Sequence, residues 1–197
     1  FAVFSAAERS VVIRVVGRFT QHLSRLRPGD ALYLRGPYGT GIPDIAADRI
    51  VLVGGGTGIA SLLEIGARLR GASLTFLLGA RTQAHLCDLD KFEALGEVRI
   101  ATDDGTAGHH GYVPALIEDA ARGGGELAFV NCGPEAMVRA CFEVQQRYAP
   151  PELIFGSIEY MMSCGIGICG KCASPSGALT CIDGPFLPMS ELGGPAA

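Results

Sequence analysis

The sequence predicts an α/β protein whose parallel sheet follows a short antiparallel β segment and precedes a small metal-binding segment. Three observations support this prediction. Apolar strand-like runs alternate with helical patterns over residues 47–149, β-branched runs separated by a turn occupy residues 1–46, and residues 150–197 are rich in Cys and Gly with little periodicity. Because strands that alternate with helices are typical of a doubly wound parallel sheet, we expect three domains with these boundaries.

The first segment reads as antiparallel β structure. The runs VVIRVV (11–16) and ALYLRG (31–36) are apolar and β-rich, and the turn RPGD (27–30) precedes the second run. Two strands are too few to close a barrel. We therefore expect a partial barrel and a chain that begins inside this domain.

The middle segment repeats a strand, a loop and a helix. The strand-like run RIVLVGG (49–55) is followed by a Gly-rich loop and by the segment IASLLEIGARLRG (59–71). This segment has apolar residues at helical spacing and ends in a Gly that would terminate the helix. Further strands are expected at 73–80, 97–104 and 126–133, and helices at 88–95, 113–122 and 134–147. Pro150 and Pro151 open the segment 150–157, which we interpret as a boundary or linker.

Four cysteines near the end of the chain have the spacing of a [2Fe-2S] site. Cys164, Cys169 and Cys172 form the pattern C-x4-C-x2-C of plant-type clusters, and Cys181 follows after an interval of eight residues. Glycines among the ligands tolerate positive φ, so the backbone can wrap closely and aim N–H groups at sulfur. The alternative is a structural zinc knot, but the two C-x2-C pairs expected of it are absent.

Two Gly-rich loops are expected at the carboxyl edge of the sheet, where α/β folds bind ligands. The loop 54–58 joins a strand to a helix, and its amides could hold a phosphate or pyrophosphate, although a tight turn is the alternative. The loop 131–135 falls on the same edge, and the two together favour a nucleotide. Asp103, Asp104 and Gly105 follow a third strand there, with a solvated acidic turn as the alternative.

Composition narrows the function classes. A net charge of -4 and a pI of about 5.5 provide no basic stripe for nucleic acid and no polybasic membrane anchor. The apolar runs fall short of the roughly 20 residues needed to cross a bilayer, and FAVFSAAERS lacks the basic region of a signal peptide.

Clustered cysteines suit a reducing compartment, so we expect a cytoplasmic protein. Cys87, Cys132 and Cys141 read as buried free thiols by default, and the motifs of a hydrolase are missing.

At this point the sequence resembles a known family. The matching segments are VGRFT (16–20), GPYGTGIP (36–43), GGGTGIASL (54–62), NCGPEAM (131–137) and SIEYMMSCGIGICGKC with TCIDGPF (157–186). Together they resemble the electron-transfer subunits of the two-subunit dihydroorotate dehydrogenases, which are ferredoxin reductase-like flavoproteins. The resemblance implies an FAD-binding antiparallel barrel, a domain that binds NAD, and a C-terminal [2Fe-2S] domain.

The resemblance also implies a set of cofactor-binding residues. Ile13, Arg14 and Val15 would line the adenosine and phosphate side of FAD, although a strand Arg facing solvent is an equal alternative for Arg14. Ala2 stands where the family has Ser, and Phe19 replaces a Gly of the pyrophosphate site, whereas Thr20 can still donate. The remaining implied residues are Gly36, Gly39, Gly55, Gly56, Thr57, Gly58, Cys132, Gly133 and Pro134, with Cys132 near the nicotinamide ring.

The implied function is electron transfer in pyrimidine biosynthesis. A nicotinamide exchanges a hydride and a cluster handles one electron, so a flavin must stand between them. In the family, dihydroorotate is oxidised at FMN in a catalytic subunit, and a heterotetramer with that partner is expected. One alternative is a gamma-type subunit of a sulfhydrogenase or an anaerobic sulfite reductase. Another, from a different class, is an interaction module that lost flavin and keeps its metal as a staple.

Overall fold

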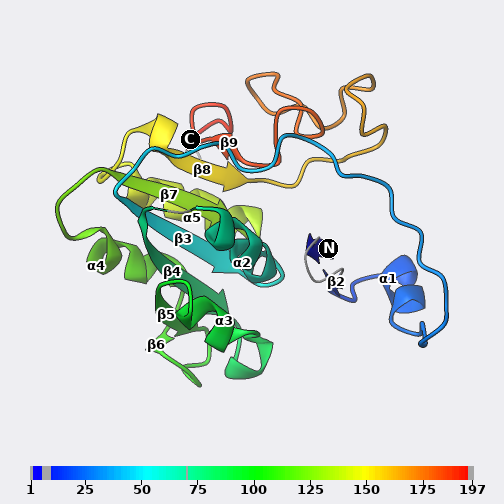
Figure 1. Cartoon of the computed structure of the whole chain (residues 1–197), viewed down its shortest axis with the longest axis horizontal. Coiled ribbons are helices and arrows are strands. Elements are labelled where there is room, and N and C mark those ends of the chain that lie inside the picture. The colour runs from blue at the N-terminus through cyan, green and yellow to red at the C-terminus, as the bar shows by residue number, and fades with distance from the viewer. Residues whose placement is uncertain (1, 6–9, 70, 195–197) are drawn as a thin grey trace.

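The computed structural model, which describes residues 2–5, 10–69 and 71–194, is built around one mostly parallel β-sheet (Figure 1). The central strand β3 (Arg49–Gly55) pairs with β4 (Ser73–Ala80) on one side and with β7 (Leu127–Cys132) on the other. The sheet is completed by β5 (Glu97–Thr102), β6 (His109–His110), β8 (Ile154–Ser157) and β9 (Leu187–Pro188). Its strand order is β6-β5-β4-β3-β7-β8-β9, and β9 is antiparallel to β8.

Helices cover both faces of this sheet. They are α2 (Gly58–Arg68), α3 (Leu89–Glu93), α4 (Ile117–Ala121) and α5 (Glu135–Gln145), with 3-10 turns at Gln83–His85, Val113–Leu116 and Pro151–Leu153. Along β3 the side chains alternate, so that Ile50 and Leu52 join the core beneath α2 while Val51 and Val53 join the core beneath α4 and α5. The doubly wound parallel sheet is therefore confirmed.

The position of β8 corrects one prediction. Residues 150–157 are not a linker, because β8 pairs with β7 from Phe129 opposite Ile154 to Cys132 opposite Ser157. Ile154 is fully buried and Phe155 is 8% exposed. The two prolines open only the short turn before β8, and the apolar residues after that turn extend the sheet. The division into three domains stays a prediction.

The N-terminal part is simpler than expected. β1 (Ala2–Ser5) and β2 (Ser10–Ile13) form a two-stranded antiparallel ribbon, and α1 (Arg18–Leu23) follows (Figure 1). The expected strand at 31–36 is wrong: these residues form neither a helix nor a strand in the described part of the chain. Tyr33 is 91% exposed and Leu34 62% exposed. Apolar residues alone do not make a strand where no partner edge is available, and the FAD-binding barrel stays a prediction.

None of the helices in the described ranges is both long and apolar enough to cross a lipid bilayer.

Candidate nucleotide and cluster sites

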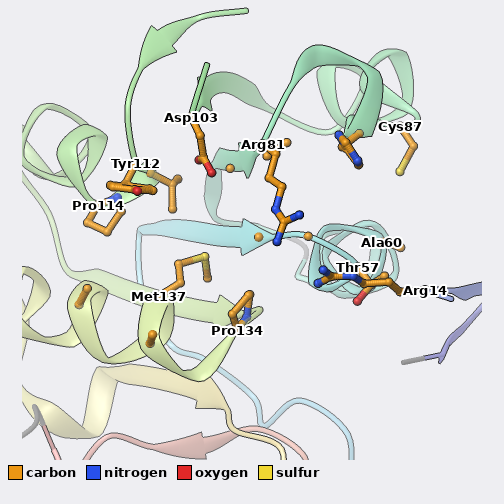
Figure 2. A pocket seen from close by; sticks show the side chains of 18 of the residues that line it. Arg14, Thr57, Ala60, Arg81, Cys87, Asp103, Tyr112, Pro114, Pro134 and Met137 are labelled. Atoms are coloured by element: carbon orange, nitrogen blue, oxygen red, sulfur yellow. The ribbon is translucent and has the colours of Figure 1, made fainter. Parts of the chain in front are cut away.

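A cavity of about 870 Å³ opens at the carboxyl edge of the sheet, where β3, β4 and β5 end and α5 begins (Figure 2). Its lining comes from the strand ends, from the start of α5 and from the N-terminal ribbon. Of the predicted site residues, the cavity is lined by Arg14, Gly55, Gly56, Thr57 and Pro134. The volume of the cavity and its position at the carboxyl edge of the sheet suit a dinucleotide.

Three predicted residues lie behind this lining. A Cβ on Gly58 would come within 2.4 Å of the Cys132 carbonyl oxygen, so Gly58 allows α2 to pack directly against the end of β7. Gly133 has φ +159 and lies against the backbone of Gly55. The Cys132 thiol donates a hydrogen bond to the Ser61 hydroxyl at 3.6 Å, and burial raises the pKa of that thiol to about 11. Gly58, Cys132 and Gly133 therefore shape the site, and Cys132 stays a neutral thiol at ordinary pH.

Arg81 is the main residue that sequence reasoning missed. It directly follows β4, lines the cavity, and reaches into it from the opposite side to Thr57 (Figure 2). Its position after a predicted buried strand is the same signal that identified Asp103, so it could have been found. Among the described residues neither the Arg81 side chain nor the Asp103 side chain has a hydrogen bond or ion pair. Both charges are thus free to meet a ligand.

The two neighbouring aspartates have different roles. Asp104 accepts hydrogen bonds from the hydroxyl (2.6 Å) and the backbone N–H (3.0 Å) of Thr106, and these bonds lower the pKa of Asp104. The Asp104 N–H donates to the Arg81 carbonyl at 3.2 Å. Asp103 instead lines the cavity. The sequence left a site residue and an acidic turn as alternatives, and both are present. Asp103 lines the cavity, and Asp104 belongs to the turn.

The residues expected near flavin are distributed along the N-terminal elements. Ala2 pairs with Ile13 in the ribbon, Val15 is 50% exposed, and Phe19 is 72% exposed on α1. The Thr20 hydroxyl is engaged locally, because it accepts from Val16 N and Gly17 N and donates to the Gly17 carbonyl. Thr20 thus caps the first turn of α1. These residues do not form a closed flavin cradle within the described ranges, and their contacts with FAD stay predictions.

The four cysteines come together as two pairs. The backbone N–H groups of Ile166 and Cys169 donate to the Cys164 sulfur at 3.5 and 3.4 Å, and with the nearby Cys169 thiol they lower the pKa of Cys164 to about 6. Cys172 and Cys181, each 2% exposed, form the second pair: hydrogen bonds led by the Cys181 backbone lower the pKa of Cys172, whereas desolvation followed by the Cys172 contact raises that of Cys181.

This two-by-two arrangement fits a binuclear cluster. A [2Fe-2S] cluster takes two protein ligands on each iron, whereas structural zinc takes four around one ion. Gly165, Gly167 and Gly170 have φ of +71, +76 and +69, so the predicted use of glycine in this loop is confirmed.

The segment 35–41 folds over the cysteine loops. Gly39 N donates to the Cys181 carbonyl at 2.9 Å, and Thr40 N donates to the Gly184 carbonyl at 2.7 Å. A Cβ on Gly39 would lie 2.0 Å from the Gly184 oxygen, and Gly36, with φ +148, belongs to the same segment. The structure therefore places Gly39, which was predicted to bind a cofactor, against the cysteine segment.

The chain combines a doubly wound sheet, a cavity of dinucleotide size at the carboxyl edge of that sheet, and four cysteines in two pairs. These features define an oxidoreductase of the ferredoxin reductase class. The solved structure of an NADH-dependent reduced ferredoxin-NADP oxidoreductase agrees: it is 33% identical, has a TM-score of 0.79, and the match covers 93% of this chain and 69% of that chain. The ferredoxin reductase of carbazole 1,9a-dioxygenase shares the fold at a TM-score of 0.51 and 20% identity.

Sequence relatives specify the family. The model for the iron-sulfur cluster binding domain of dihydroorotate dehydrogenase B matches residues 159–193. The probable electron transfer subunit of dihydroorotate dehydrogenase B (NAD(+)) from Methanocaldococcus jannaschii is 35% identical, with 92% of this chain and 71% of the relative covered. The corresponding subunit from Caldanaerobacter subterraneus is 34% identical, with 96% and 77% covered. The chain belongs to the family of dihydroorotate dehydrogenase B electron transfer subunits.

Proposed function

We propose that this chain moves electrons between a [2Fe-2S] cluster, FAD and NAD(H) as the electron-transfer subunit of a dihydroorotate dehydrogenase complex. One observation carries the proposal: a dinucleotide-sized cavity and two pairs of thiols occur in one chain, and the segment 35–41 joins the cysteine loops to the N-terminal region. Relatives of which this chain covers 71% and 77% are named as electron transfer subunits of this enzyme.

The cavity residues bind and orient the nicotinamide nucleotide. Gly55, Gly56 and Thr57 line the cavity just before α2, whose N-terminus offers N–H groups and a positive dipole end to the pyrophosphate. The Gly56 N–H itself donates to the Gly79 carbonyl at 3.3 Å. The Arg81 guanidinium adds a charge-assisted donor there. Gly133 and Pro134 leave room for close approach of the nicotinamide beside the neutral Cys132 thiol.

The remaining carriers follow from the chemistry. Cys164, Cys169, Cys172 and Cys181 hold the cluster, with the amides of Ile166 and Cys169 stabilising the Cys164 thiolate. Ile13, Val15 and the Phe19–Thr20 pair would contact FAD, whereas Arg14 lines the cavity assigned to the nicotinamide nucleotide. When bound, FAD converts between the two-electron chemistry of a nicotinamide and the one-electron chemistry of a cluster.

The partner follows from the names of the relatives. Dihydroorotate would be oxidised at FMN in a separate catalytic subunit, and this chain would pass the electrons to NAD+ within a heterotetramer, in the cytoplasm, during pyrimidine biosynthesis. A gamma-type subunit of a sulfhydrogenase or sulfite reductase would use the same carriers. Co-purification of an FMN protein, as opposed to a nickel or sirohaem protein, separates the two.

Low-temperature EPR with a visible spectrum, recorded before and after anaerobic addition of NADH, tests the proposal. The full-length protein should develop a rhombic S = 1/2 signal while its flavin absorbance bleaches. With dithionite as the reductant, Cys172→Ser should lose the signal. Cys87→Ser, at a cysteine that is exposed and not buried as predicted, should keep it. A colourless protein that is EPR-silent even with dithionite, and that contains zinc, would overturn electron transfer in favour of a metal-stapled interaction module.

A further inference from the structure

Arg35 makes an unusual set of contacts with the first cysteine of the cluster segment. Its Nη2 donates to the carbonyl oxygens of Ser163 (3.3 Å) and Cys164 (2.5 Å), which lie 128 and 129 residues further along the chain. Its Nε donates to the Tyr38 hydroxyl, and its guanidinium carbon lies 5.4 Å from the centroid of the Tyr38 ring. A permanent positive charge is thus fixed beside a cluster ligand.

Tyr38 holds this arrangement in place. Its ring fills the space beside Gly165, since a Cβ there would lie 2.6 Å from the ring. The next residue, Gly39, bonds to the Cys181 carbonyl. The segment therefore touches the loop of the first ligand and the loop of the last one, and the guanidinium, although exposed, is anchored by two carbonyls and one hydroxyl.

We propose that Arg35 is a positioning residue that raises the reduction potential of the cluster. The inference rests on the proposed function, because it needs a cluster on the four cysteines. Reduction adds one negative charge to a cluster already held by thiolates, and a nearby cation stabilises the reduced form more than the oxidised form. Hydrogen bonds and charges around the sulfurs are the means by which proteins set such potentials.

Other charges near the cysteines do not share this anchoring. Lys171 lies between two ligands in the sequence, and its side chain has no hydrogen bond or ion pair among the described residues. The Asp183 carboxylate accepts from Leu179 N at 2.7 Å and opposes the effect of a cation. Arg35 differs because it comes from the N-terminal region, so its position depends on how that region folds onto the cluster segment.

A set of charge variants tests the inference. The midpoint potential of the cluster is measured in the full-length protein by EPR at defined potentials. Arg35→Gln should shift it to more negative values, Arg35→Lys should stay closer to the wild type, and the shift should shrink as salt screens the exposed charge. Arg25→Gln is the matched control, because Arg25 follows α1, which lies apart from the cysteine segment (Figure 1). The midpoint potential of the cluster should not change in this variant.

The possible outcomes separate the inference from the function on which it rests. A wild-type potential in Arg35→Gln overturns the inference alone, whereas a wild-type protein without any S = 1/2 signal overturns the proposed function as well. Arg35→Met, a second neutral variant that covers the same surface, serves if Arg35→Gln does not hold the cluster. If neither neutral variant holds a cluster while Arg35→Lys does, the charge acts in cluster retention and the proposed effect on potential is overturned.

Discussion

The side chains of Asn131 and Gln145 exchange two hydrogen bonds in the interior between β7 and α5. Asn131 Nδ2 donates to Gln145 Oε1 at 2.9 Å, and Gln145 Nε2 donates to Asn131 Oδ1 at 2.8 Å. Asn131 also donates to the Phe155 carbonyl in β8, and both amide side chains are fully buried. This pair ties the start of the Cys132–Pro134 loop to a helix on one side and to the strand that leads to the cysteines on the other.

Asn131→Leu should therefore destabilise the fold by about 1–3 kcal/mol, because the Gln145 amide would be buried without its partner. The double variant Asn131→Leu with Gln145→Met should lose less than the sum of the two single variants, since it leaves no unpaired side-chain amide. Urea unfolding of the four proteins measures this coupling. Strictly additive losses would show that the two amides do not depend on each other.

Gly58→Ala should weaken NADH binding by about tenfold or more, because its Cβ would press on the Cys132 carbonyl and displace the edge of β7. Gly66→Ala is the matched control on the same helix: its Cβ would meet the Phe76 ring at 2.7 Å, away from the cavity. It should lower the free energy of unfolding by about 1–3 kcal/mol with little change in affinity. Calorimetric titration with NADH measures the affinity of the two variants, and equal affinities would contradict the role of Gly58.

Gly39→Ala should lower the iron content per chain and speed the loss of cluster colour to a chelator. Its Cβ would collide with the Gly184 carbonyl and break the hydrogen bond from Gly39 N to Cys181. Gly29→Ala has a comparable positive φ of +100 but no neighbouring atoms, so it should cost only the backbone strain of about 1–2 kcal/mol. If the two variants hold their clusters equally well, the segment 35–41 does not support the cysteine loops.

The free energy of unfolding should fall as the pH rises above 9. Burial raises the pKa of Cys141 from 9.0 to about 12, so the folded state keeps a proton that the unfolded state loses. The contribution is fully present below pH 9 and is lost between pH 9 and about 12. Cys141 alone should account for a loss of about 1 kcal/mol between pH 8 and pH 10. Urea unfolding under reducing conditions should show a smaller pH dependence in Cys141→Ala; an unchanged dependence would contradict this account.

Local patterns of residues were enough to predict several parts of this protein. The alternation of buried runs and amphipathic helices predicted the doubly wound sheet, and β4 spans the predicted residues 73–80. The spacing of the four cysteines predicted a [2Fe-2S] site among Gly residues that tolerate positive φ, and Gly165, Gly167 and Gly170 have such φ values. These features depend on residues that are close in the sequence, so they can be predicted from the sequence.

The contacts between distant segments are visible only in the folded chain. The tertiary structure turned residues 154–157 into a sheet strand, left 31–36 without a strand partner, and assigned Asp103 to the cavity and Asp104 to its turn. It also placed Arg35 on the Cys164 carbonyl. Periodicity shows which face of an element is buried but not which element covers it, and contacts between residues more than a hundred positions apart are formed only when the chain folds.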